Sequence, residues 1–224
     1  VAEGLADAAA LGEIEKRRSA AVQKISGAHT ALSAEDFPNK AALLSELKSV
    51  MDRANALRSR ADAAVKQLEA DVAAGAVGVG EIGKGFGLST RKADGTLLKI
   101  DDPELDPVWE AAGRLKIPVF IHTAEPQEFF QPIDYSNERW LELALFSDRR
   151  NYGPGQVTFE TLITERNDLF RQHPKTRFIA AHFGYCAQDL KTCGEVLDKY
   201  PNVVLEVSAV LYDFGRQPRA ARDF

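Results

Sequence analysis

The hydrophobic pattern after residue 75 predicts strands that alternate with helices. Short apolar runs bounded by glycine or proline are typical of strands buried on both faces, as in parallel sheets. Longer segments with apolar residues three and four positions apart predict amphipathic helices. This alternation predicts right-handed parallel βαβ units and therefore an α/β fold class. The expected strands are 76–83, 117–123, 177–182 and 203–208, and the expected helices are about 101–115, 138–145, 158–172 and 187–199.

The first part of the chain has a different texture, because Ala, Glu, Lys, Arg and Leu dominate it. Its composition predicts a helix over Ala2–Ser26. We expect Gly27–Thr30 to break this helix, which would place His29 in a solvated loop. A second helix is expected to begin at about Asn39, after a proline that cannot lie inside a helix.

The apolar positions of the second helix recur at intervals of three and four and continue to Gly75, a natural helix end. Such a length predicts either a break near Asn55 or a projecting helical hairpin. We therefore expect two domains, a helical region over 1–74 that serves packing or oligomerisation, and an α/β portion over 75–224.

Composition excludes some classes of protein. The 224 residues include 45% hydrophobic residues, enough for a sizeable core, and the formal net charge of -5 argues against a nucleic-acid partner. No apolar run is long enough to span a membrane. Cys186 and Cys193 fall on one expected helix, about 10 Å apart along its axis, too far for a disulfide. Two free thiols favour a reducing, cytoplasmic compartment, although a cleaved leader stays open.

Two of the expected strands end in a histidine. His122 closes the run at 117–123, and His182 closes the run at 177–182. Because the carboxyl ends of parallel strands meet at one edge, both imidazoles should reach the same rim. Glu81 and Glu206 fall near the ends of the other two strands, although Glu206 lies in mid-strand and could instead pair with a base. Two imidazoles and a carboxylate are ligands of zinc, or of manganese or iron.

Several motifs then follow one another in an order that resembles a known family. The motifs are Ile117–Pro126, Phe129–Asp134, Asn137–Trp140, His173–His182 and Gly215–Pro218. Together they resemble the amidohydrolase superfamily, and within it the amidohydrolase-related metal-dependent hydrolases, which include relatives of aminocarboxymuconate-semialdehyde decarboxylase.

The resemblance implies a (β/α)8 TIM-barrel fold, incomplete in this chain, with a divalent metal at the carboxyl rim. It implies that His122 and His182 bind this metal, with Glu81 near the fourth-strand position, where it also resembles the glutamate of TatD-type deoxyribonucleases. His173 is expected to be a core histidine. The family's first-strand His-x-His pair and its eighth-strand aspartate have no counterpart in this sequence, so a fragment, an incomplete record and a lost site all stay open.

Two reactions are compatible with such a family. One is hydrolysis of an amide, ester or lactone carbonyl by metal-activated water. The other is non-oxidative decarboxylation of an aromatic or unsaturated acid. Phe130 and Trp140, with Phe129 and Tyr212, could line an apolar pocket, or they could be core residues. Residues that could clamp a substrate carboxylate are Arg139 and Arg216.

A non-catalytic scaffold with a vestigial barrel is the third reading of the sequence. The expected partner is a small-molecule substrate, with no nucleic acid and no membrane, and the helical region could support a homo-oligomer. The expected cofactor is a divalent ion, zinc before manganese or iron. Metal content separates the scaffold from both enzymes.

Overall fold

The computed structural model describes residues 19–21, 23–31, 33–34 and 39–224. The chain divides into two units, Val1–Lys66 and Gln67–Phe224. Most of the helix expected over Ala2–Ser26 lies outside the described residues.

Residues 27–30 are helical, so the break predicted at Gly27–Thr30 is wrong. Thr30 Oγ1 donates to the Ser26 carbonyl oxygen at 3.0 Å, and Ser33 Oγ donates to the His29 carbonyl oxygen at 2.7 Å. Hydroxyls that bond four residues back fit inside a helix, and one glycine costs a helix only about 1 kcal/mol. His29 consequently lies on a helix, partly exposed, and not in a loop.

Helix α2 runs without interruption over Lys40–Ala73, a length of 34 residues. Its first residue confirms a start near Asn39. Its end confirms the stop at Gly75, whose φ of +108° is easy only for glycine. Of the two alternatives for this long segment, the break near Asn55 is wrong. No helix in the described part of the chain is long and apolar enough to cross a membrane.

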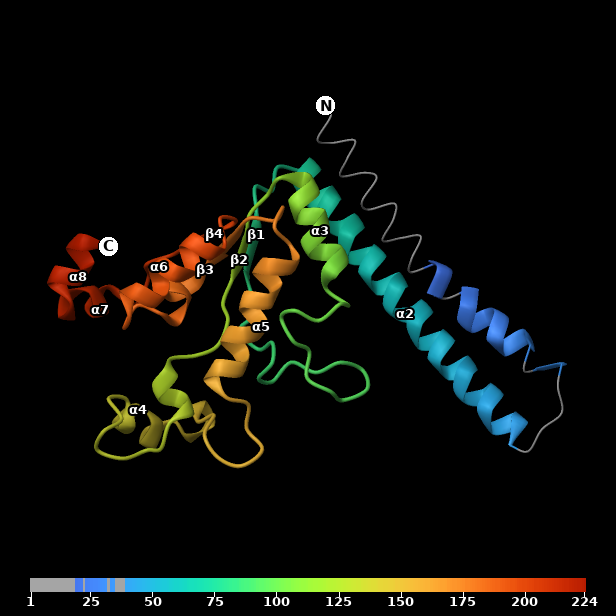
Figure 1. The fold of residues 1–224 in the computed structure, drawn as a ribbon, viewed down its shortest axis with the longest axis horizontal. Coiled ribbons are helices and arrows are strands. Elements are labelled where there is room, and N and C mark those ends of the chain that lie inside the picture. Colours follow the sequence, from blue (N-terminus) through green and yellow to red (C-terminus); the bar gives the residue numbers. More distant parts are fainter. Residues whose placement is uncertain (1–18, 22, 32, 35–38) are drawn as a thin grey trace. The chain divides into compact units, whose positions relative to one another are not determined.

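The second unit alternates strands and helices as expected, and its parallel sheet contains four strands within the described residues (Figure 1). Each strand is shorter than the pattern predicted. The strands are β1 (Val79–Ile82), β2 (Val119–Ile121), β3 (Phe178–Ala180) and β4 (Val203–Leu205). The helices are α3 (Asp106–Leu115), α4 (Trp140–Leu145), α5 (Phe159–Gln172), α6 (Leu190–Lys199), α7 (Leu211–Arg216) and α8 (Pro218–Asp223), with the 3-10 turns η1 (Gln127–Phe130), η2 (Ser147–Arg149) and η3 (Ala181–Tyr185).

The strands pair in chain order, β1-β2-β3-β4, and every pair is parallel. In the central pair, Ile121 lies opposite Ala180, and Ala180 in turn lies opposite Leu205. Strands β2, β3 and β4 therefore end level with one another. The residues that follow them emerge at one edge of the sheet.

Helix α3 begins at Asp106, later than the start predicted at residue 101. Asp102 Oδ1 accepts from the amide of Glu104 at 3.1 Å, so the acidic segment forms a turn of its own before the helix. Pro107 then occupies the first turn, where a missing amide hydrogen costs nothing. The predicted end at Leu115 is confirmed.

The prediction of two free thiols is wrong, because Cys186 and Cys193 form a disulfide with a Cα–Cα distance of 5.5 Å. Helix α6 begins at Leu190 and not at residue 187, since the carboxylate of Asp189 caps it by accepting from the amides two and three residues on. Cys186 therefore precedes the helix, and the chain turns between the two cysteines. The prediction of a reducing compartment depended on two free thiols and therefore loses its basis.

The core of the second unit contains buried residues of the sheet and of the helices α3, α5 and α6. Phe178, in β3, one of the two inner strands, is fully buried and packs against the rings of Trp109 and Phe170. A smaller cluster follows β3 and β4, around Phe183, Leu190 and Val210.

We expect Phe178→Ala to lower the free energy of unfolding by about 3–5 kcal/mol, since it empties a closely packed site between two aromatic rings. The control is Val204→Ala in the neighbouring strand, where the side chain is 46% exposed and the expected loss is below about 1 kcal/mol. Urea unfolding of both variants measures the difference. Equal losses would contradict this description of the core.

Candidate metal centre

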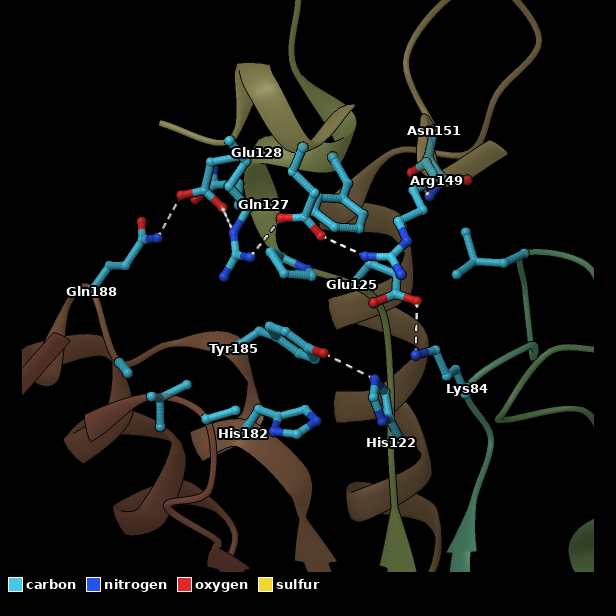
Figure 2. A pocket seen from close by; sticks show the side chains of 18 of the residues that line it. Lys84, His122, Glu125, Gln127, Glu128, Arg149, Asn151, His182, Tyr185 and Gln188 are labelled. Carbon is cyan, nitrogen blue, oxygen red and sulfur yellow. Dashed lines mark hydrogen bonds and ion pairs between the residues drawn. The ribbon is translucent and has the colours of Figure 1, made fainter. Parts of the chain in front are cut away.

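A cleft of about 690 Å³ opens at the carboxyl edge of the sheet. A loop after each strand contributes to its lining: Lys84 follows β1, His122 follows β2, Tyr185 follows β3 and Val210 follows β4. Figure 2 shows Tyr185 and His182 reaching toward His122 at one side of this cleft. Ligands of parallel α/β sheets bind at this edge.

His122 is buried and has a hydrogen-bond partner on each ring nitrogen. Its Nδ1 lies 2.5 Å from Glu81 Oε1, and its Nε2 lies 2.9 Å from the hydroxyl of Tyr185. His122 directly follows the last residue of β2, and its amide donates to the Ile82 carbonyl oxygen at 2.8 Å. The end of the parallel pairing therefore fixes the position of this imidazole.

His182 lies two residues beyond β3, with its ring 4.7 Å from that of His122, centroid to centroid. Its Nδ1 lies 3.0 Å from the carbonyl oxygen of Ser208. Glu206 supports the same loop, because its carboxylate accepts from the hydroxyl and amide of Ser208, each at 2.6 Å, and from the amide of His182 at 3.4 Å. Glu206 follows β4 rather than lying in mid-strand, and its role is to hold the loop.

The structure brings Glu81, His122 and His182 together, with one ligand atom from each within 4.8 Å of the others. Two imidazole nitrogens and a carboxylate form a donor set that suits zinc, manganese or iron. The residues fit a divalent ion because the carbonyl on Nδ1 of His182 leaves Nε2 of that ring for a cation.

The backbone after β3 adopts an unusual conformation. His182, Phe183, Gly184 and Tyr185 have φ values between 53° and 60°, so the chain makes a left-handed turn. For residues other than glycine this region costs about 1–2 kcal/mol each. Such strain persists only when surrounding contacts hold it, and it is concentrated at functional sites.

Arg166, on α5, stabilises this turn through a hydrogen bond. Its guanidinium donates to the carbonyl oxygen of Gly184 and to the side chain of Asn167, and it lies over the ring of Phe170. Arg166 is buried, and burial lowers its pKa to about 10. A buried, charged donor gives a strong hydrogen bond, which helps to offset the strain of the turn.

Tyr185 was not among the sequence candidates. The structure places its hydroxyl on His122 and its ring 5.5 Å from that of His182. Burial, followed by repulsion from Glu125, raises the pKa of Tyr185 above its usual value, so the hydroxyl keeps its proton at neutral pH. The sequence signal that could have identified Tyr185 is its position three residues after a strand-end histidine, beyond a glycine.

The residues expected to bind substrate separate into two groups. Arg139 lines the cleft, as do Phe129 and Tyr212. Arg139 Nη2 donates to the Tyr212 hydroxyl at 3.0 Å, and its Nη1 donates to Glu142 at 3.0 Å. The guanidinium is thus engaged within the protein.

Phe130, Trp140 and Arg216 do not line this cleft. Phe129 and Phe130 are consecutive residues of the 3-10 turn η1, where neighbours point in directions about 120° apart, so the two rings do not share one face. Phe130 packs on Phe159 and borders another cleft, and Trp140 is 43% exposed. Arg216 pairs with Glu138 at 2.6 Å. His173, as expected, is a buried histidine apart from the cleft, paired with Asp106 at 3.1 Å.

The pKa values of two acids in the cleft are shifted in opposite directions. Burial acts to raise the pKa of Glu142, but hydrogen bonds from Arg139 and Arg149 outweigh it and lower that pKa. Asp213 is buried and lines the cleft, and burial raises its pKa.

We expect Glu142→Gln to lower the melting temperature at neutral pH and to have little effect at about pH 2. The lowered pKa means that the ionised Glu142 stabilises the fold above its ordinary value of 4.5, and that this contribution is lost as the pH falls through the lowered pKa. The ion pairs of Glu142 with Arg139 and Arg149 are partly exposed, so they contribute less than about 1 kcal/mol to the free energy of unfolding. Thermal unfolding across this pH range measures the effect, and an undiminished difference at low pH would contradict it.

The comparison with protein families agrees with this geometry. A family model described as amidohydrolase matches residues 26–223. No curated protein and no solved structure matches the chain. Members of this family are generally metal-dependent, and the triad of Glu81, His122 and His182 is a candidate for such a metal. The chain belongs to the amidohydrolase family, whose fold is the TIM barrel, and its parallel strands correspond to an incomplete barrel of this kind.

Proposed function

We propose that this chain carries the metal site of a hydrolase, in which activated water attacks an amide, ester or lactone carbonyl of a small molecule. The observation that supports it most directly is the pair of strand-end histidines, His122 and His182, which face one cleft with their rings 4.7 Å apart. Both would bind the ion, and Glu81 would complete or support the set. The donor atoms favour zinc, with manganese and iron as alternatives.

When bound, a divalent ion supplies a water of lowered pKa and polarises a carbonyl oxygen. The residues of the chain position and orient the metal-binding side chains and the substrate. Glu81 and the Ser208 carbonyl fix the rings of the two histidines through their Nδ1 atoms. Phe129 offers the substrate an apolar surface in the cleft, and the hydroxyl of Tyr185 is a donor at the histidine pair.

Charge pairing in the cleft favours hydrolysis over decarboxylation of an acid. Lys84 pairs with Glu125 at 3.3 Å, and both Arg139 and Arg149 donate to Glu142. Each cation that lines the cleft thus has a carboxylate of the chain itself as its partner. A substrate carboxylate would have to displace one of these, whereas a neutral carbonyl would not. Decarboxylation, as in relatives of aminocarboxymuconate-semialdehyde decarboxylase, is therefore the second candidate.

We expect His122→Ala and His182→Ala each to weaken zinc binding by more than about 100-fold, since loss of a ligand exceeds the loss that follows removal of an outer-shell partner. The matched control is His173→Ala, which removes a buried histidine that is paired with Asp106 and lies apart from the cleft. Isothermal titration with zinc, with elemental analysis of the isolated protein, measures the effect.

Turnover of an aryl ester and a lactone, and carbon dioxide release from an aromatic acid, then separate the two reactions in the zinc-loaded protein. Zinc binding by the wild-type chain that depends on both cleft histidines supports the proposal. Absence of zinc binding by the wild-type chain would point to the non-catalytic scaffold instead. A loss of zinc binding in His173→Ala as large as that in His122→Ala would do the same.

A further inference from the structure

The hydrogen bonds of His122 determine which ring nitrogen carries its proton. A carboxylate can only accept a hydrogen bond, so the contact of 2.5 Å with Glu81 places the proton on Nδ1. The neutral ring then has its lone pair on Nε2, which accepts from the hydroxyl of Tyr185 at 2.9 Å. The chain Tyr185–His122–Glu81 therefore runs in one direction, from hydroxyl to imidazole to carboxylate.

The same reasoning applies to His182. The carbonyl oxygen of Ser208 can only accept, so the proton of His182 also lies on Nδ1 and its lone pair lies on Nε2. Both histidines of the pair thus offer Nε2 as the atom that can bind a cation. In histidines that bind metals the other nitrogen usually donates to a carboxylate or a carbonyl, which is the arrangement of both rings here.

Glu81 and Tyr185 consequently lie at opposite nitrogens of one ring. Glu81 Oε1 contacts Nδ1, where the carboxylate accepts the ring hydrogen, so Nε2 is the atom of this ring that a cation can bind. The hydroxyl of Tyr185, in contrast, occupies the lone pair that a cation needs.

We propose that the hydroxyl of Tyr185 and a divalent ion compete for Nε2 of His122, that ion binding releases this hydroxyl as a donor into the cleft, and that Glu81 orients His122 instead of acting as a third ligand. The inference rests on the proposed binding of an ion by His122 and His182. No proton is lost in the exchange, because the hydroxyl keeps its hydrogen and Nδ1 keeps its bond to Glu81. A released hydroxyl can donate to an oxygen of a bound small molecule.

The surroundings of Tyr185 allow such a release. Its backbone is fixed by the left-handed turn and by the bond from Arg166 to the neighbouring Gly184, while its side chain borders the open cleft. The hydroxyl can therefore leave His122 by rotation of the side chain, without movement of the turn that carries His182.

The test is the affinity for zinc of the full chain with Tyr185→Phe, measured by isothermal titration. Removal of a hydroxyl that competes for Nε2 should tighten zinc binding about fivefold, the worth of one typical net hydrogen bond. Tyr212→Phe is the matched control, since it removes a hydroxyl of the same cleft that bonds to Arg139 and to neither histidine, and its affinity should equal that of the wild type. Thermal unfolding verifies that both variants fold.

Glu81→Gln tests the second part of the proposal, the orienting role of Glu81. Its amide oxygen can still accept from Nδ1, so zinc binding should weaken by only about tenfold, as for an outer-shell partner. A loss as large as that of His122→Ala would overturn the orienting role of Glu81. Zinc binding by the wild type with no gain in Tyr185→Phe would overturn the competition and leave the proposed metal site intact, whereas no zinc binding by the wild type would overturn both.

A second measurement does not depend on any variant. Long-range nitrogen–proton NMR of the histidine rings should show His122 and His182 protonated at Nδ1 in zinc-free protein, and zinc should move the resonance of Nε2 in both. Loss of the proton from Nδ1 of His122 when zinc binds would overturn the proposal.

Discussion

The level, parallel pairing of β2 with β3 is the constraint on which the histidine pair depends. Ile121 lies opposite Ala180, so His122 and the residue before His182 leave the sheet side by side. Successive strand residues are about 3.3 Å apart and point to opposite faces, so a shift of one residue would separate the rings and turn one of them away. The buried residues of both strands oppose such a shift, because it would expose the fully buried Phe178.

Geometry at the edge of the sheet is then completed by a strained segment. The turn from His182 to Tyr185 is left-handed, and packing and hydrogen bonding keep it so. Phe183, in its middle, is buried against the rings of Phe214 and Phe224, and its amide donates to the Glu206 carbonyl oxygen at 2.6 Å. The apolar cluster beside the sheet thus does more than fill space, since it holds a backbone that would otherwise relax. The turn delivers two polar side chains, three residues apart, to one histidine.

Much of the second unit could be predicted from the sequence, because its strands are short, apolar and interrupted by helices of clear period. The same pattern placed His122 and His182 near strand ends, where strand pairing fixes the backbone of His122, while His182 also depends on the left-handed turn that begins with it. Tyr185 could not be placed in this way, since a left-handed turn has no hydrophobic period. The disulfide was missed because the exact first residue of α6 depends on the cap at Asp189. Which of two adjacent side chains faces the cleft, as for Phe129 and Phe130, depends on how the short 3-10 turn η1 is oriented, which the apolar pattern of the sequence does not specify.

The disulfide has a consequence for the redox behaviour of this edge of the sheet. Cys186 directly follows Tyr185, so the covalent bond to Cys193 anchors the exit of the left-handed turn to helix α6. Reduction would leave the turn with only its noncovalent anchors, among them the bond from Arg166 to Gly184 and the bond from the amide of His182 to the carboxylate of Glu206. The disulfide is therefore the covalent anchor next to the turn that carries His182.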